Sequence, residues 1–430
     1  MVDMATAKTT IGAVRMIYGR ENPYRLRIYC GDVGFVVDMQ KLSNNLLGIM
    51  IFAFLHRFHF FLFSFGIVCF VLLAGAVYQF QKTAADLTAF PPPGRMISVN
   101  GVNLHLFCVG SGFPTLILEA GLGENTLSWY PVQSKLAQNM RVCSYDRPGL
   151  GWSDLINAPI QVEDVAKNLH TLLNNAGISP PYVLVGHSRG GIYVRAFYRQ
   201  FPAETQGIVL VDSTHEQGPM HQYPHAAWDY WKQAMQIAIA EPLSRVGLVR
   251  LMGVADADRR PSPLPAEVLA AKTAVQNRTD TARAVVNEIT VMRQGLTATT
   301  PPPTSLGNLP LLVLTAGNLV DQSLVEREAE KSGKNIETEK VLARIQQTEQ
   351  DDLARLSNNS RHIIIKNSGH FIMQDRAEEF VSAVSEFVNP IDPKLEDERP
   401  TNHSTGPAQK AAQSGEFKRY ALAESIHTRK

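Results

Sequence analysis

Residues 182–198 read YVLVGHSRGGIYVRAFY, and no other stretch of the sequence is as informative about the fold. A short apolar run typical of a buried strand leads directly into Gly186-His187-Ser188-Arg189-Gly190, which opens an amphipathic helix. A G-x-S-x-G pentapeptide alone is weak evidence, but between a strand and a helix it predicts a strained turn that raises the serine hydroxyl above a sheet. The glycines lack a Cβ, so the strand and the helix can approach closely. We therefore predict that Ser188 is a nucleophile.

The helix that follows Ser188 also predicts an oxyanion site. Its first amides point at the reaction centre, so the Arg189 N–H can stabilise an oxyanion with the help of the helix dipole. A second donor is expected from a glycine-rich loop, Gly121-Leu122-Gly123 in ILEAGLGENTLSW, with the Leu122 N–H as the candidate. The alternative is that these glycines only turn the chain.

Around this motif, residues 95–389 alternate between β-rich runs and helical stretches. A mostly parallel sheet with helices on both faces is expected from this alternation. An insertion at about 213–307, which includes HAAWDYWKQAMQIAIA and LPAEVLAAKTAVQ, predicts a helical cap over the strand ends. The expected strands are RMISV, NLHLFCVG, TLILEAG, RVCSYD, YVLVGHS, GIVLVD, PLLVLTAG and HIIIKNSG, and the expected helices outside the cap include 161–175, 191–200 and 377–388.

Among the twelve histidines, His370 has the position of a general base, because it follows the last predicted strand in Ser368-Gly369-His370. His187 lies inside the serine turn and would pack beside the nucleophile. His221 and His225 have H-x-x-x-H spacing, but Pro224 argues against the helix that would align them, and the glutamate of a zinc protease is missing. We predict no metal site and no cofactor.

Several motifs in order resemble one family: EAGLG, YDRPGLGWSD, GHSRGG, GIVLVDSTHE and SGHFI. Together they resemble the cap-bearing esterases, epoxide hydrolases and haloalkane dehalogenases of the α/β-hydrolase fold, over about 95–389. The chain departs from the family at Ala120-Gly121, where relatives have His-Gly. It also has Ser188 where epoxide hydrolases and dehalogenases carry aspartate, which implies acyl transfer rather than alkyl-enzyme chemistry.

The resemblance also implies an acid that orients His370, and two aspartates qualify. Most relatives place it after the strand that corresponds to PLLVLTAG, where Asp321 stands one residue late. Some dehalogenases place it after the preceding strand, where Asp212 ends GIVLVD. We favour Asp212 because a strand holds it rigidly, and Asp321 stays open as the alternative.

These residues predict a serine hydrolase that cleaves a carboxylic ester through a Ser-His-Asp triad and an acyl-enzyme. Two alternatives remain open: an amidase or peptidase of the same fold, and a hydrolase-like binding protein without turnover. The cap residues Trp228, Tyr230, Trp231 and Met235 indicate an apolar small-molecule acyl substrate, unless they form the core of the cap itself.

An uncharged apolar run, FFLFSFGIVCFVLLAGAVYQFQ at 60–81, predicts a transmembrane helix at about 58–81. A buried core helix and a cleaved signal peptide are the alternatives; Ala74–Ala76 offers small residues, but inside the run. Basic residues predominate before the run, which places the N-terminus in the cytoplasm and the catalytic domain outside. The basic residues before it are Lys8, Arg15, Arg20, Arg25, Arg27, Lys41 and Arg57, against Lys82 and Arg95 after it.

The remaining composition limits partners and compartments. A net charge of +1 over 430 residues provides no basic field for nucleic acid. The four cysteines, Cys30, Cys69, Cys108 and Cys143, form no CxxC pair; we interpret them as buried or lipid-facing thiols, with a Cys108–Cys143 disulfide as the alternative. Residues 1–45 receive no fold, and the polar tail 391–430 is predicted to be disordered.

Overall fold

A computed structural model describes residues 10–11, 14–18, 25–30, 33–216, 224–256, 263–297 and 304–389. The chain divides into two compact units, 1–74 and 75–430. The predicted disordered tail lies outside the described residues. So does His221, and of His225, Trp228, Tyr230 and Trp231 only the backbone is described.

The N-terminal unit contains an antiparallel sheet that the sequence analysis did not assign. Its strands pair in chain order, β1-β2-β3-β4, as successive hairpins. The runs VRMIY, RLRIYC and VGFVVD are rich in β-branched and aromatic residues, which favour strands. The strands are β1 Thr10–Ile11, β2 Val14–Tyr18, β3 Arg25–Cys30 and β4 Val33–Asp38.

Helix α1, Met39–Ala89, follows this sheet and extends into the second unit. Residues Asn44–Ala89 are apolar enough to cross a membrane, and no part of their most apolar window is buried by protein. The predicted span at 58–81 lies inside this longer helix. Between Arg57 and Lys82 no residue is charged. At a rise of about 1.5 Å per residue, that stretch is long enough for a hydrocarbon core of about 30 Å.

The second unit is built on an eight-stranded sheet in the order β12-β11-β10-β9-β7-β8-β6-β5. Strands β7 to β12 pair in parallel, and β6 and β5 add an antiparallel edge. The sheet contains all eight predicted strands. They are β5 Arg95–Val99, β6 Val102–Val109, β7 Thr115–Glu119, β8 Arg141–Tyr145, β9 Tyr182–His187, β10 Thr205–Val211, β11 Leu311–Ala316 and β12 Ser360–Ile365.

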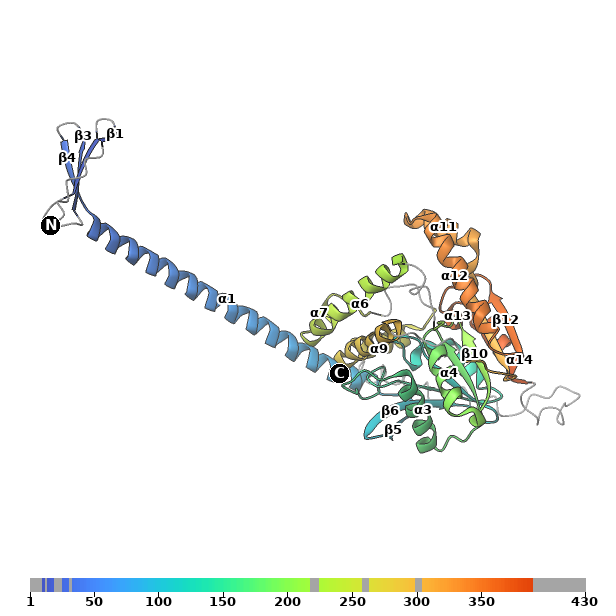
Figure 1. Cartoon of the computed structure of the whole chain (residues 1–430). Coiled ribbons are helices and arrows are strands. Elements are labelled where there is room, and N and C mark those ends of the chain that lie inside the picture. The colour runs from blue at the N-terminus through green and yellow to red at the C-terminus, as the bar shows by residue number, and fades with distance from the viewer. Residues whose placement is uncertain are drawn as a thin grey trace, which may run out of the picture. The chain divides into compact units, whose positions relative to one another are not determined.

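Helices cover both faces of this sheet (Figure 1), which confirms the predicted fold class. One face packs against α3 and α4, and the other against α2, α13 and α14. Strand β9 is buried along its whole length, as expected for a central strand with helices on both sides. The bounds are η1 Thr126–Trp129, α2 Tyr130–Leu136, α3 Val162–Ala176, α4 Gly190–Gln200, η2 Pro202–Glu204, α13 Ile372–Asp375 and α14 Ala377–Val388.

Two further helical groups follow β10 and β11. Helices α6 Pro224–Arg245, α7 Leu248–Leu251, α8 Ala266–Gln276 and α9 Thr279–Thr297 lie between β10 and β11, in the range assigned to the cap. Met235 on α6 is exposed, so its side chain lies neither in a cap core nor in a closed pocket. After β11 come α10 Gly317–Val320, α11 Gln322–Ser332 and α12 Ile336–Ala354, of which the sequence analysis gave no account.

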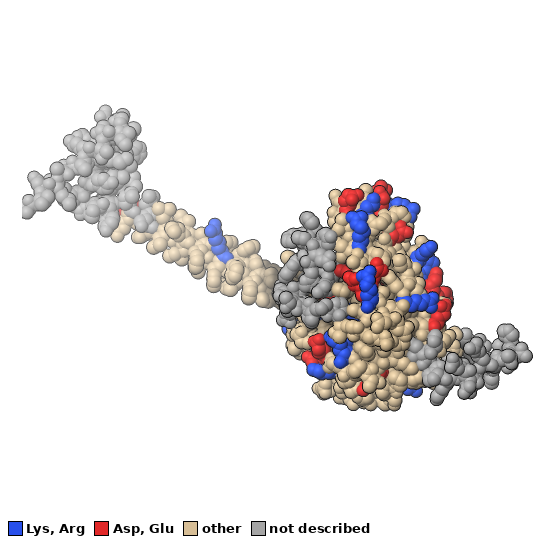
Figure 2. Space-filling view, turned by 45° about the vertical axis from the view of Figure 1, so that its right-hand side comes forward, with Lys and Arg blue, Asp and Glu red and all other residues tan. Residues whose placement is uncertain are grey.

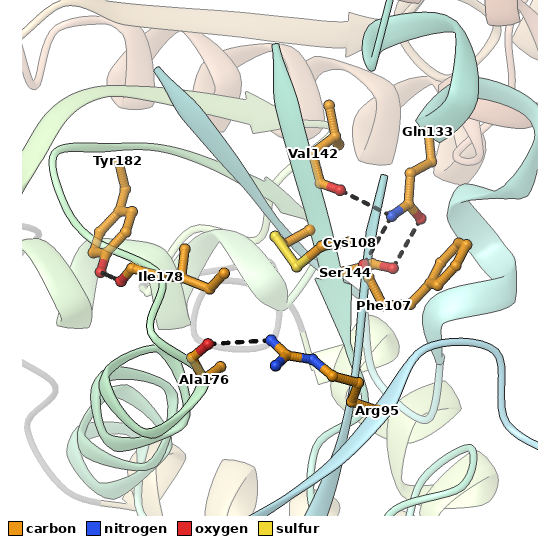
Figure 3. Close-up of a disulfide and its surroundings, with 10 residues drawn as sticks. Arg95, Phe107, Cys108, Gln133, Val142, Ser144, Ala176, Ile178 and Tyr182 are labelled. Carbon is orange, nitrogen blue, oxygen red and sulfur yellow. Dashed lines mark hydrogen bonds between the residues drawn. A yellow bond between two sulfur atoms is a disulfide. The ribbon is translucent and has the colours of Figure 1, made fainter. Parts of the chain in front are cut away.

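A disulfide joins Cys108 on β6 to Cys143 on β8 (Figure 3). The two residues stand directly opposite each other in the antiparallel pair. Gln133 on α2 bridges the same two strands, because its amide donates to the carbonyls of Phe107 and Val142 at 3.0 and 3.2 Å. The interpretation of these two cysteines as thiols was therefore wrong, and the alternative pairing is the one observed. Cys69 on α1 remains free and exposed.

Candidate active site

Ser188 occupies the sharp turn between β9 and α4. Its φ of 53° lies in the left-handed region, which is strained for a residue with a side chain. The glycines around it are required by contact. A Cβ at Gly190 would lie 2.3 Å from the Glu119 carbonyl oxygen, and a Cβ at Gly186 would lie 2.7 Å from backbone atoms of Gly190 and Gly191. The turn thus has the geometry that the pentapeptide predicted.

His370 and Asp212 are brought together from different parts of the chain. Asp212 follows β10, next to β9, and its Oδ2 lies 2.6 Å from His370 Nδ1. Its other carboxylate oxygen accepts from the Ala316 amide at 3.1 Å. The Asp212 carboxylate is fully buried while the His370 ring is 39% exposed. A buried acceptor beside a partly open ring can fix the ring orientation and leave its other nitrogen free to face a substrate.

Asp321, the alternative acid, has a different environment. It is the N-cap of α11, and its Oδ1 accepts from the amides of Ser323 and Leu324 at 2.9 and 3.2 Å. These bonds, together with one from the Ser323 hydroxyl, hold its pKa below the ordinary value. Asp321 therefore stabilises the start of α11, and Asp212 is the aspartate that contacts His370.

The electrostatics of His370 follow from its partner. Burial alone would lower the pKa of His370, but the hydrogen bond to Asp212 and the Asp212 charge outweigh it, with a further contribution from Glu124. The pKa of His370 is therefore raised above its ordinary value of 6.5. The imidazolium form that a general base reaches during attack is the form that this site favours.

His187 links the serine turn to the backbone that carries His370. Its Nε2 lies 2.9 Å from the His370 carbonyl oxygen, and its Nδ1 lies 2.9 Å from Glu124 Oε2. Despite burial, the charge of His187 and its hydrogen bond lower the pKa of Glu124 to about 2. Both ring nitrogens face oxygen acceptors, so both contacts are hydrogen bonds only when each nitrogen carries a hydrogen. His187 lies beside Ser188 as expected, but its link to Glu124 was not predicted.

A buried ionic network holds the loop that contains Leu122. Arg147 donates to the carbonyl oxygens of Ala120 and Gly121 at 2.7 and 2.6 Å. It also pairs with Glu119 at 2.7 Å and with Glu288 at 2.6 Å. Glu288, on cap helix α9, in turn accepts from the Gly123 amide at 3.0 Å. The network therefore connects the sheet, the loop and the cap.

The backbone amides on both sides of Leu122 thus donate hydrogen bonds to carboxylates. The Gly121 amide donates to Glu124 at 3.0 Å and the Gly123 amide to Glu288. Within the described part of the chain, the Leu122 and Arg189 amides have no acceptor. A Cβ built on Gly121 would lie 3.2 Å from the Ser188 Cβ, so this loop borders the serine. Two backbone amides without an acceptor, next to the Ser188 turn, are the kind of donors that an oxyanion site requires.

Three residues of this site escaped the sequence analysis. Arg147 stands in the quoted run YDRPGLGWSD and Glu124 stands two residues after Leu122, so position in a motif could have suggested both. Nothing near Glu288 marks it, because its role depends on how the cap packs. No cluster of three or more metal-ligating side chains occurs among the described residues.

We predict that Arg147→Met lowers the free energy of unfolding by about 3–5 kcal/mol, because it leaves the buried Glu119 carboxylate and the partly buried Glu288 carboxylate without their cation. Guanidinium unfolding of the detergent-solubilised full chain measures this change. Arg199→Met is the matched control: its partner Glu163 lies on the surface at 3.3 Å, so we expect a loss below about 1 kcal/mol. Equal small losses in both variants would show that the network contributes little stability.

The second unit combines a mostly parallel α/β sheet, a serine at a strand-to-helix turn, and a His-Asp pair supplied by the loops after β12 and β10, an arrangement typical of one class of hydrolases. The model of the alpha/beta hydrolase family matches residues 112–383, and the chain belongs to that family.

Solved structures of similar fold include a candidate lipase of Acinetobacter baumannii, with 20% identity over 74% of this chain and 97% of that one at a TM-score of 0.50. A candidate acyltransferase of Salmonella enterica has 17% identity over 70% of this chain and 97% of that one, at a TM-score of 0.51. At these identities the likeness shows the fold alone.

Curated relatives match only in part. An uncharacterised vacuolar membrane protein of Saccharomyces cerevisiae is 31% identical over 138 residues, which cover 28% of this chain and 21% of that protein. In eight of the curated relatives, the matched stretch makes up between 15 and 41% of their length. None of these proteins is matched over most of its length.

Proposed function

We propose that this hydrolase cleaves a carboxylic ester through an acyl-enzyme on Ser188. The contact between His370 and Asp212, beside a serine at a strained turn, carries the proposal. His370 removes the Ser188 proton, and the oxygen attacks the acyl carbonyl. The Leu122 and Arg189 amides bind the oxyanion, His370 protonates the leaving alcohol, and water then releases the acid by the reverse sequence.

The first test is covalent labelling. A fluorophosphonate phosphorylates an activated serine, so the wild-type chain should be labelled, and a peptide map should place the label on Ser188. A binding protein on the same scaffold, without an activated serine, would stay unlabelled. Parallel assays with an ester and an amide of the same acyl group separate the esterase from the amidase.

We predict that activity declines as the pH falls through a value above 6.5. His370 accepts a proton only in its neutral form, and its pKa is raised from 6.5 chiefly by Asp212, against the effect of burial. The pH dependence of kcat/KM on a soluble chromogenic ester measures this limb. A limb at or below 6.5 would contradict the assignment of His370 as the base in this environment.

We further propose that α1 anchors the chain in a membrane once, with the hydrolase unit on the extracytoplasmic side. The excess of basic residues before the apolar run supports this orientation. The Cys108–Cys143 disulfide supports it too, because disulfides persist in oxidising compartments and are rare in the cytosol. On the face of the hydrolase unit that Figure 2 shows, Lys and Arg are mixed with Asp and Glu, so this face is not strongly basic.

N-glycosylation tests this orientation when the chain is expressed in a eukaryotic secretory host. Asn358 is an exposed sequon, whereas Asn277 is buried and bonds to Gln79 and Asp256. In an Asn402→Gln background, we predict a glycan that Asn358→Gln removes and Asn277→Gln retains. An unglycosylated chain with its Asn358 sequon intact would mean that the hydrolase unit faces the cytosol.

A further inference from the structure

The last turns of α1, from Gly75 onward, pack against the cap. A Cβ at Gly75 would lie 2.4 Å from the Val246 carbonyl oxygen, and one at Gly247 would lie 3.0 Å from the Tyr78 ring. Gln79 is buried and donates to the Asn277 carbonyl at 2.7 Å. The end of α1 therefore contacts the segment that begins α7.

Arg250 on α7 strengthens this contact with an ion pair and a hydrogen bond. It pairs with Asp86 at 2.5 Å and donates to Gln79 Oε1 at 3.1 Å. Its guanidinium is therefore turned toward α1 and away from solvent. Since Gln79 and Asp86 are two turns apart on one helix face, α7 is held along the end of α1.

These contacts place α7 beside the C-terminal end of the apolar run. The last apolar residue of the run is Phe80, and Lys82 is the first charged residue after the run. Tyr78 lies near the end of the run, where tyrosines gather at membrane interfaces. If α1 crosses a membrane, the segment that touches Gly75 and Tyr78 must lie at the bilayer surface.

The outward face of that segment is apolar. Leu251, Met252 and Val254 are 64, 52 and 49% exposed, and Leu248 is also exposed. With Arg250 turned inward, no charged side chain interrupts 246–255 on this face. Scattered apolar side chains are ordinary on a protein surface, but a contiguous apolar group marks an interaction site.

We propose that the surface formed by Leu248, Leu251, Met252 and Val254 of the cap is seated in the headgroup and acyl boundary of the bilayer that holds α1. The inference depends on the membrane anchor proposed above and adds a second, peripheral contact to it. Insertion of apolar side chains at this boundary is favourable, because it removes their surface from water. The cap, whose helix α9 bonds to the Gly123 loop through Glu288, is then held against lipid.

Spin labels on the full-length chain in phosphatidylcholine vesicles test this contact. The background carries Cys30→Ser and Cys69→Ser and keeps the disulfide, and labels are placed at Leu251→Cys or Met252→Cys. Lys331→Cys on α11, with a side chain 69% exposed, is the matched control on the same unit. A chain that keeps Cys69 and carries its label there shows whether α1 lies in the lipid. Fluorophosphonate labelling of each variant verifies that the active site is intact.

The readout is the collision rate of each label with oxygen, which partitions into lipid, relative to a water-soluble nickel chelate. We expect a ratio severalfold higher at Leu251 and Met252 than at Lys331, and highest at Cys69. A lipid-like Cys69 with water-like Leu251 and Met252 overturns the cap contact and leaves the anchor intact. A water-like Cys69 overturns both. Dipolar broadening at Leu251 that disappears on dilution with unlabelled chain would assign the surface to a second copy instead.

Discussion

Ser188→Ala should reduce ester hydrolysis to the background rate, a loss on the order of 10⁶-fold in kcat if this triad behaves as others do. The substitution removes the only atom that the proposed mechanism uses to form the acyl-enzyme. Ester turnover and fluorophosphonate labelling, measured side by side, check the loss. We expect both signals to disappear together.

The fold of this variant should survive, because the loss of one oxygen at a turn creates no large cavity. A thermal transition close to that of the wild type would verify this. Ser382→Ala, on the exposed face of α14, is the matched control and should retain full activity. If Ser188→Ala still turned over substrate at the wild-type rate, the chain would not be a serine hydrolase of this design.

Asp212→Asn should lower kcat by about 10³–10⁴-fold with little change in KM, the range known for triads held in the wrong tautomer. The carboxylate of Asp212 accepts from His370 Nδ1 at 2.6 Å, and an amide could present a hydrogen there instead. His370 would then be held with its proton on the nitrogen that should act as the base. Steady-state kinetics on one soluble ester measure the effect.

Asp321→Asn is the comparison that makes this prediction specific. Asparagine is as good an N-cap as aspartate, so the start of α11 should remain intact and activity should stay near that of the wild type. The opposite pattern, with the large loss in Asp321→Asn, would move the acid to the strand β11 position that most relatives use. The two variants thus decide between the alternatives that the sequence left open.

The sequence was informative where function depends on local geometry. GHSRGG at the end of an apolar run predicted a strand, a tight turn and a helix, because only glycines allow the close approach seen at Gly186 and Gly190. The apolar strands with helices between them predicted a parallel sheet, because such strands are buried on both faces. The place of His370 after the last strand made it the candidate general base. None of these inferences needed long-range contacts.

Other features depend on how distant segments pack, and no local pattern predicts them. Cys108 and Cys143 lie opposite each other only because β6 and β8 are neighbours in the sheet, although β7 separates them along the chain. Arg147 and Glu288 meet because the cap folds back over the loop at Leu122. Helices α11 and α12 were missed because polar amphipathic stretches between two strong strand patterns give a weak signal.

The division between Asp212 and Asp321 shows the same limit at the site itself. The sequence placed both carboxylates at strand ends. A pattern of apolar residues can locate a strand end, but it cannot show which carboxylate contacts His370. Tertiary structure decided which carboxylate meets His370, because that contact depends on the loop after β12 reaching back across β11 to β10. Bond geometry sets the relative positions of neighbouring residues in one strand or one helix turn. A contact between residues 158 positions apart forms only once the order of the strands and the packing of the loops are set.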